Sequence, residues 1–127
     1  VLGVCVQEDA SFFRPILEGL LEELLAGCPS TNTPSFTILD AYVGGGYGVA
    51  DENLWRMILQ AARASGLVLD PWYTAKAFSA LVDRARLDME AGFTQVFLHT
   101  GGGFALFARE DLASHLAGEP PSSPEPQ

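Results

Sequence analysis

The residues best suited to chemistry follow a short apolar run at 67–69. Tyr73 and Thr74 lie just after it, in the stretch Leu-Asp-Pro-Trp-Tyr-Thr-Ala-Lys-Ala at 69–77. Pro71 disfavours helical backbone angles just before it, and Thr74 can cap the amphipathic run that follows. Both hydroxyl groups are therefore predicted near a strand-to-helix junction, where a phenol can hydrogen-bond a carboxylate or help to move a proton.

Two glycine-rich stretches flank this one and carry further candidates. The stretch Gly-Gly-Tyr-Gly-Val at 45–49 places Tyr47 upstream, and His-Thr-Gly-Gly-Gly-Phe-Ala-Leu-Phe at 99–107 lies downstream. The glycine spacing does not match the dinucleotide pattern G-x-G-x-x-G. Close approach of the backbone to a flat ring is our main interpretation of Gly101 to Gly103, and a phosphate grip is the alternative.

Together and in this order, the three motifs resemble the C-terminal part of the D-cysteine desulfhydrase and 1-aminocyclopropane-1-carboxylate deaminase family. These are pyridoxal-phosphate enzymes of the tryptophan-synthase-β fold type, and the resemblance extends from Val1 to about Phe107. Thr74 after the motif tyrosine resembles the desulfhydrase branch, because the deaminase branch typically has glutamate there. Trp72 and Ala75 depart from the family pattern, which usually has a small aliphatic residue and a glycine at these positions.

The resemblance implies pyridoxal 5'-phosphate as the cofactor and a small amino acid as the substrate. Tyr47 and Tyr73 would be catalytic residues beside the substrate. The residues implied to contact the cofactor are Thr74, Thr100, Gly101 and Gly102, with a threonine hydroxyl at the pyridine nitrogen. The implied reaction is α,β-elimination from D-cysteine, which releases pyruvate, ammonia and hydrogen sulfide. The substrate of this branch stays open between D-cysteine, 1-aminocyclopropane-1-carboxylate and another amino acid.

The resemblance also implies parts that this chain does not contain. Family members attach the cofactor to a lysine near their N-terminus, whereas the one lysine here, Lys76, lies two residues into a predicted helix. We expect Lys76 to be solvated or snorkelling. We therefore expect a fragment that is inactive alone, that needs the N-terminal part of its enzyme and that is a homodimer when complete. The alternatives are a non-catalytic small-molecule-binding or interaction domain derived from this fold, or a fragment of a deaminase-like enzyme.

Composition argues against several other classes. The net charge of −9 disfavours nucleic acid and anionic membranes as partners. The hydrophobic fraction of 48% is typical of a globular protein, and no apolar run approaches the roughly 20 residues needed to span a bilayer. The run 1–6 does not resemble a signal peptide, and Cys5 and Cys28 form neither a disulfide framework nor a metal site. We expect a cytoplasmic protein with no metal ligands.

Alternating strands and helices must position the motifs. Valine-rich and apolar runs predict strands at 1–6, 35–43, 67–69 and 95–99. Amphipathic spacing predicts helices at 12–25, 52–64, 74–89 and 103–109. The first helix is capped by Asp9 or Ser11 and ends near Gly27, and the second is capped by Asp51 and closed by Gly66.

This rhythm predicts an α/β fold with three αβα layers and a mainly parallel sheet, in one domain over 1–117. Ligands collect outside the carboxyl ends of parallel strands, so the three motifs are expected at one edge of the sheet. His99 ends a strand and is expected to be a hydrogen-bonded structural residue, whereas His115 is expected to face solvent. Proline and serine predict a disordered tail at 118–127.

Overall fold

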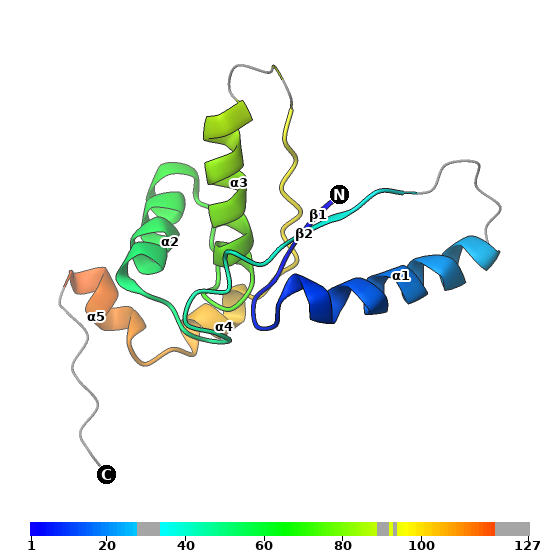
Figure 1. Cartoon of the computed structure of the whole chain (residues 1–127). Coiled ribbons are helices and arrows are strands. Elements are labelled where there is room, and N and C mark those ends of the chain that lie inside the picture. The colour runs from blue at the N-terminus through cyan, green and yellow to red at the C-terminus, as the bar shows by residue number, and fades with distance from the viewer. Residues whose placement is uncertain (28–33, 89–91, 93, 119–127) are drawn as a thin grey trace, which may run out of the picture.

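The computed structural model describes residues 1–27, 34–88, 92 and 94–118. This part of the chain contains a two-stranded parallel sheet and five helices (Figure 1). The strands are β1 (Leu2–Val4) and β2 (Thr37–Leu39), and the helices are α1 (Ala10–Gly27), α2 (Glu52–Ser65), α3 (Thr74–Asp88), α4 (Gly103–Phe107) and α5 (Leu112–Ala117). The predicted α/β class is confirmed, because a helix joins two parallel strands and further helices follow.

The two strands are shorter than predicted. Their register pairs Leu2 with Thr37, Gly3 with Ile38 and Val4 with Leu39. The ladder continues by one bond at each end, since Thr37 N–H donates to the Val1 carbonyl (2.9 Å) and Cys5 N–H donates to the Leu39 carbonyl (2.8 Å). Beyond Leu39 the chain turns, because Val43 N–H donates to the Asp40 carbonyl. This turn leads directly into the first glycine-rich motif.

The predicted strands at 67–69 and 95–99 differ from the structure. Neither segment is in a backbone ladder among the described residues. They are linked instead through a side chain, as His99 Nε2 lies 2.9 Å from the Val68 carbonyl oxygen. A strand needs a second strand alongside it for its backbone hydrogen bonds, and within the described ranges such a pairing exists for β1 and β2.

Local capping residues set the ends of the first two long helices. Asp9 caps α1, because its carboxylate accepts from Phe12 N–H (2.9 Å) and from the Ser11 hydroxyl (2.7 Å). Asp51 caps α2 by accepting from Leu54 N–H at 2.8 Å, and Gly66 closes that helix with a left-handed φ of 71°. The prediction for α2 is therefore confirmed at both ends.

The buried core lies among α2, α3 and α4. It consists of Trp55, Ile58, Ala61, Leu69, Ala75 and Leu106. Leu69 and Ala75 flank the second motif, so this core fixes the backbone on which the motif tyrosine stands. By contrast, α1 has no buried residue, and Figure 1 shows it lying beside the two strands and apart from the other helices.

The C-terminal helix α5 was not predicted, although Asp111 and Gly118 flank it as cap residues. The prediction that His115 faces solvent is wrong. Its side chain is only 11% exposed, and its ring stacks on Trp55 with 4.1 Å between ring centroids, because α5 folds back onto α2. Most of the predicted tail, Cys28 and Met89 lie outside the described residues. Within the described ranges, no helix has both the length and the apolar character to cross a bilayer.

Candidate active site

The motif tyrosine stands on a loop that one buried carboxylate organises. Asp70 is fully buried, and its Oδ1 accepts from the N–H groups of Trp72 (2.9 Å) and Tyr73 (2.8 Å). Its Oδ2 accepts from Thr74 N–H (3.1 Å) and from the Thr74 hydroxyl. These bonds satisfy N–H groups that a helix start leaves without partners. Sequence reasoning missed this role, although an aspartate four residues before a helix start and next to a proline was the available signal.

Thr74 lies inside this loop. Its side chain is 1% exposed, and its hydroxyl oxygen accepts from Asp70 N–H at 2.8 Å while its proton goes to the Asp70 carboxylate. A hydroxyl donates only one hydrogen bond, so this one is committed within the loop. The contact between Thr74 and the cofactor that the resemblance implies stays a prediction.

The structure brings together the two tyrosines that were predicted to be catalytic. The Tyr47 and Tyr73 phenol oxygens lie 2.7 Å apart, and their rings meet edge to face with 5.6 Å between centroids. Both side chains are about half exposed, at 49% and 47%. The hydrogen bond with Tyr47 raises the pKa of Tyr73 above its ordinary value, because loss of the proton would break that bond. Tyr73 therefore keeps its proton at neutral pH, and its phenol lies where a small molecule can reach it.

The third motif packs against the Asp70 loop. The Val68 carbonyl can only accept, so His99 donates from Nε2, and its Nδ1 accepts from Gly101 N–H at 3.1 Å. Gly101 and Gly102 have left-handed φ angles of 103° and 93° and are exposed. Thr100 is exposed beside them. The prediction that His99 has a structural, hydrogen-bonded role agrees with these bonds.

The prediction that Lys76 is solvated is wrong. Its side chain is 2% exposed, and Nζ donates to the carbonyl oxygens of Val6 (3.2 Å), Val43 (2.7 Å) and Gly46 (2.6 Å). Burial lowers the pKa of Lys76 from its ordinary value. The side chain points inward because β1 and the first glycine turn pass over the start of α3.

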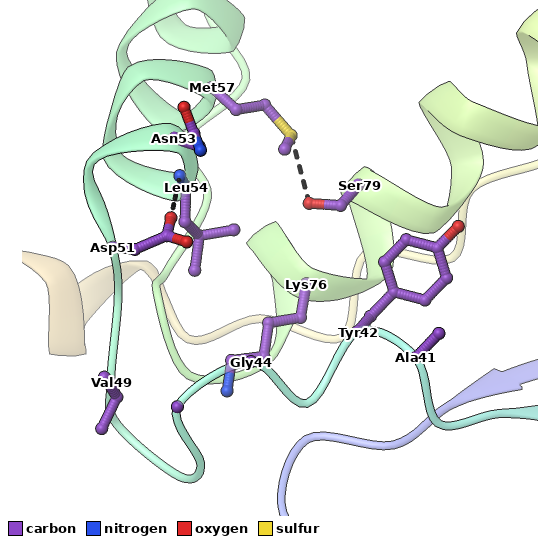
Figure 2. Close-up of a pocket in the computed structure, with 11 residues that line it drawn as sticks. Ala41, Tyr42, Gly44, Val49, Asp51, Asn53, Leu54, Met57, Lys76 and Ser79 are labelled. Carbon is purple, nitrogen blue, oxygen red and sulfur yellow. Dashed lines mark hydrogen bonds between the residues drawn. The ribbon is translucent and has the colours of Figure 1, made fainter.

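A cleft of about 200 Å³ lies between the glycine turn and helices α2 and α3. Figure 2 shows the Lys76 side chain extending toward Gly44, with Asp51, Met57 and Ser79 around the cleft. The Ser79 hydroxyl donates to the Ala75 carbonyl at 3.0 Å, and Asp51 is occupied as a helix cap. Tyr47 and Tyr73 do not line this cleft, so the paired phenols face a different space.

Comparison with known proteins places the chain in a family. A family described as pyridoxal-phosphate dependent enzyme matches residues 3–101. The chain is 36% identical over 114 residues to the Thermotoga maritima protein named "Putative 1-aminocyclopropane-1-carboxylate deaminase". This similarity covers 86% of the chain and 34% of the relative, so the chain spans about a third of the length of the curated relative it matches. The family match contains all of the first two motifs and the start of the third, and the chain accordingly belongs to the pyridoxal-phosphate dependent enzyme family.

Proposed function

We propose that this chain forms the substrate-facing side of a pyridoxal-phosphate dependent carbon–sulfur lyase that acts on D-cysteine. The hydrogen-bonded pair Tyr47–Tyr73 carries the proposal, because it offers two exposed phenols 2.7 Å apart within the matched family region. The threonine at position 74 supports the desulfhydrase reaction, since it resembles that branch. The activity belongs to a protein longer than this chain, as the relative's length suggests.

The described residues fit one side of the cofactor and do not fit its covalent attachment. Gly101 is exposed and has nothing within 4 Å of an added β-carbon, so its missing side chain leaves room for a flat ring, and Gly102 beside it is also exposed. Thr100 stands beside them with an exposed side chain and is the better placed of the two threonines to meet a ring nitrogen. Lys76, the one lysine in the sequence, already donates to three carbonyl groups inside the protein. The attaching lysine would therefore come from outside these residues.

The cofactor would supply the electron withdrawal that weakens bonds at the substrate α-carbon. The tyrosine pair would supply protons. Two phenols carry two protons, and one of them is used in the bond between them. Either hydroxyl can donate in that bond, so one proton of the pair stays free to meet the substrate carboxylate or the departing sulfur. The overall reaction converts D-cysteine and water to pyruvate, ammonia and hydrogen sulfide.

A deaminase acting on 1-aminocyclopropane-1-carboxylate is the second candidate. The name of the Thermotoga maritima relative favours it. Both candidates use the same cofactor and a substrate carboxylate, so the tyrosine pair serves either one. They differ in whether a sulfur leaves or a strained ring opens, and substrate discrimination therefore decides between them.

The test uses reduced conjugates of the cofactor with amino acids, which need no attaching lysine. The ring carbons of the three tyrosines are labelled and followed by NMR while phosphopyridoxyl-D-cysteine is added to the chain. We expect the resonances of Tyr47 and Tyr73 to shift and that of Tyr42 to stay, because Tyr42 is occupied by Asp83 at the other side of the turn. Tyr47→Phe should weaken binding of the conjugate.

Two comparisons sharpen this experiment. The conjugate of 1-aminocyclopropane-1-carboxylate should bind less tightly than that of D-cysteine, and the reverse order would favour the deaminase. Perturbation of Tyr42 alone, or of no tyrosine, would overturn the proposed site. The isolated chain with added cofactor should release no pyruvate from D-cysteine. Pyruvate release would show that the chain does not need a lysine from outside it to attach the cofactor.

A further inference from the structure

The turn that carries Tyr47 is weakly held by its own backbone. Gly44, Gly46 and Gly48 all have positive φ, at 61°, 108° and 74°, so the turn uses conformations that only glycine adopts readily. Its internal hydrogen bonds are long, with 3.2 Å from Gly46 N–H to the Val43 carbonyl and 3.3 Å from Val49 N–H to the Gly46 carbonyl. The cleft between the turn and α2 and α3 leaves one side without tight packing. Something other than the turn itself must fix the Tyr47 phenol.

Lys76 binds the turn on one side of Tyr47. Its ammonium group contacts the carbonyl of Gly46, the residue just before Tyr47, at 2.6 Å, and that of Val43 at 2.7 Å. The third bond, to the Val6 carbonyl, ties the same point to the end of β1. Lys76 is on the first turn of α3, three residues after Tyr73. One ammonium group thus joins the turn of Tyr47 to the helix start of Tyr73.

Arg109 binds the turn on the other side. Its guanidinium donates to the carbonyl of Gly48, the residue just after Tyr47, at 3.2 Å. Asp111 accepts from Nε at 2.7 Å and from a second nitrogen of the same guanidinium, which fixes its plane. The Arg109 side chain also lies over the rings of Trp55 and Trp72, at 5.4 and 5.3 Å from their centroids.

Trp72 connects this second contact to the Tyr73 loop. It is the residue before Tyr73. A β-carbon at Gly48 would lie 2.9 Å from the Trp72 indole nitrogen, so the turn and the indole are in close contact. The turn is therefore packed against the loop that presents its partner tyrosine.

We infer that Lys76 and Arg109 are positioning residues that hold the Tyr47 phenol against Tyr73 by binding the carbonyl groups on both sides of Tyr47. The inference rests on the proposed function, because the tyrosine pair acts as the proton donor only in that proposal. A buried ammonium is costly unless it is bound, and among the described residues Lys76 has no carboxylate partner. Its three hydrogen bonds to carbonyl groups explain why the ammonium group is buried. Two of them go to the turn, and the third goes to Val6, just after β1.

The test follows the titration of Tyr73 in the chain without cofactor. The carbon next to each phenol oxygen is labelled, and the titration of the three tyrosines is followed by NMR in Lys76→Met, Arg109→Gln and the parent. We expect the Tyr73 titration to move down toward that of a free tyrosine in both variants, while the Tyr42 titration stays. Arg56→Gln is the matched control, because Arg56 is exposed and its guanidinium donates to the side chain of nearby Asn53, away from the turn.

Two further measurements separate positioning from general loss of structure. In a Tyr47→Phe background, Lys76→Met should move the Tyr73 titration no further, because the bond it protects is already gone. In Lys76→Ala, added methylammonium should restore the Tyr73 titration by occupying the same three carbonyls. If Lys76→Met fails to fold, the Tyr73 titration in Arg109→Gln tests the inference.

Folded variants whose Tyr73 titrates as in the parent would overturn the inference. So would an equal shift of Tyr42, which would mean that the fold has loosened as a whole. The proposed function can fail separately. In that case the conjugates do not bind, while the Tyr73 titration still responds to Lys76 and Arg109.

Discussion

Gly102 lies directly against the carboxylate of Asp70. A β-carbon added at Gly102 would lie 2.8 Å from the Asp70 carboxyl carbon and closer still to one of its oxygens. The contact joins the third motif to the loop that carries Tyr73, and it occurs at a left-handed φ of 93°. Two independent requirements, space and backbone angle, therefore select glycine at this position.

The first prediction concerns this contact. Gly102→Ala should destabilise the protein by about 1–3 kcal/mol, because it adds backbone strain and a clash with a buried carboxylate. Gly19→Ala is the matched control, since Gly19 is inside α1 with nothing within 4 Å of an added β-carbon. That variant should be stabilised by about 0.5–1 kcal/mol. Urea unfolding of the two variants measures both changes, and equal free energies would show that the Gly102 contact is absent in solution.

The second prediction concerns Asp70. Asp70→Asn should destabilise the protein by about 1–3 kcal/mol, because an amide nitrogen cannot accept from the N–H groups of the loop. Loss of order in the loop should also move the Tyr73 resonance. Glu23→Gln, at an exposed position on α1, should change neither quantity. An Asp70→Asn protein with the stability of the parent would mean that water replaces the carboxylate.

The third prediction concerns the tyrosine pair. Tyr47→Phe should lower the pKa of Tyr73 toward its ordinary value, because the bond that favours the protonated phenol is removed. The difference spectrum of tyrosinate formation during an alkaline titration measures it, with Tyr42→Phe as the control. An unchanged Tyr73 titration would show that the two hydroxyls are not bonded in solution.

The fourth prediction concerns acid. The Arg109 guanidinium holds the pKa of Asp111 below its ordinary value. The folded pKa is lower than the unfolded one, so the stabilisation is present above the unfolded pKa of about 3.9 and is lost as pH falls through the folded value. Asp111→Asn should remove a contribution on the order of 1 kcal/mol near neutral pH, since both side chains are partly exposed and screened.

Urea unfolding at a series of pH values between about 6 and about 2 measures this contribution as the difference between Asp111→Asn and the parent. The difference should shrink toward zero at the acid end. Asp83→Asn is the control, because the Asp83–Arg86 pair is more exposed and longer, at 3.5 Å. A constant difference at every pH would exclude the ion pair as its cause.

The fifth prediction concerns the uncovered face of α1. Leu20 and Leu24 are 57% and 64% exposed, and they line an apolar groove of about 340 Å³ beside the strands with Ile38. Apolar patches of more than a few hundred Å² mark interaction surfaces. We expect the chain to self-associate with rising concentration despite its net charge of −9. Leu20→Glu should abolish this in light scattering, and Leu87→Glu, at an exposed position on α3, should leave it; a monomer at every concentration would contradict the prediction.

The sequence by itself indicated the family of the chain and determined both ends of α2. Asp51 and Gly66 were recognisable as the limits of α2, because caps depend on residues within four positions of each other. The order of the three motifs likewise pointed to the pyridoxal-phosphate family, and the matched residues 3–101 confirm it. The strands predicted at 67–69 and 95–99 were wrong, because local sequence does not show whether a segment has a second strand to pair with.

Only the tertiary structure decided which side chains the motifs depend on. The sequence indicated a solvated or snorkelling Lys76. Its three carbonyl partners, however, lie 30, 33 and 70 residues away along the chain. His115 was misjudged for the same reason, because the indole on which it stacks belongs to another helix. The 2.7 Å contact between Tyr47 and Tyr73 spans 26 residues. Residue type and periodicity record the apolar character of a segment, whereas a hydrogen bond between distant groups depends on how the segments pack.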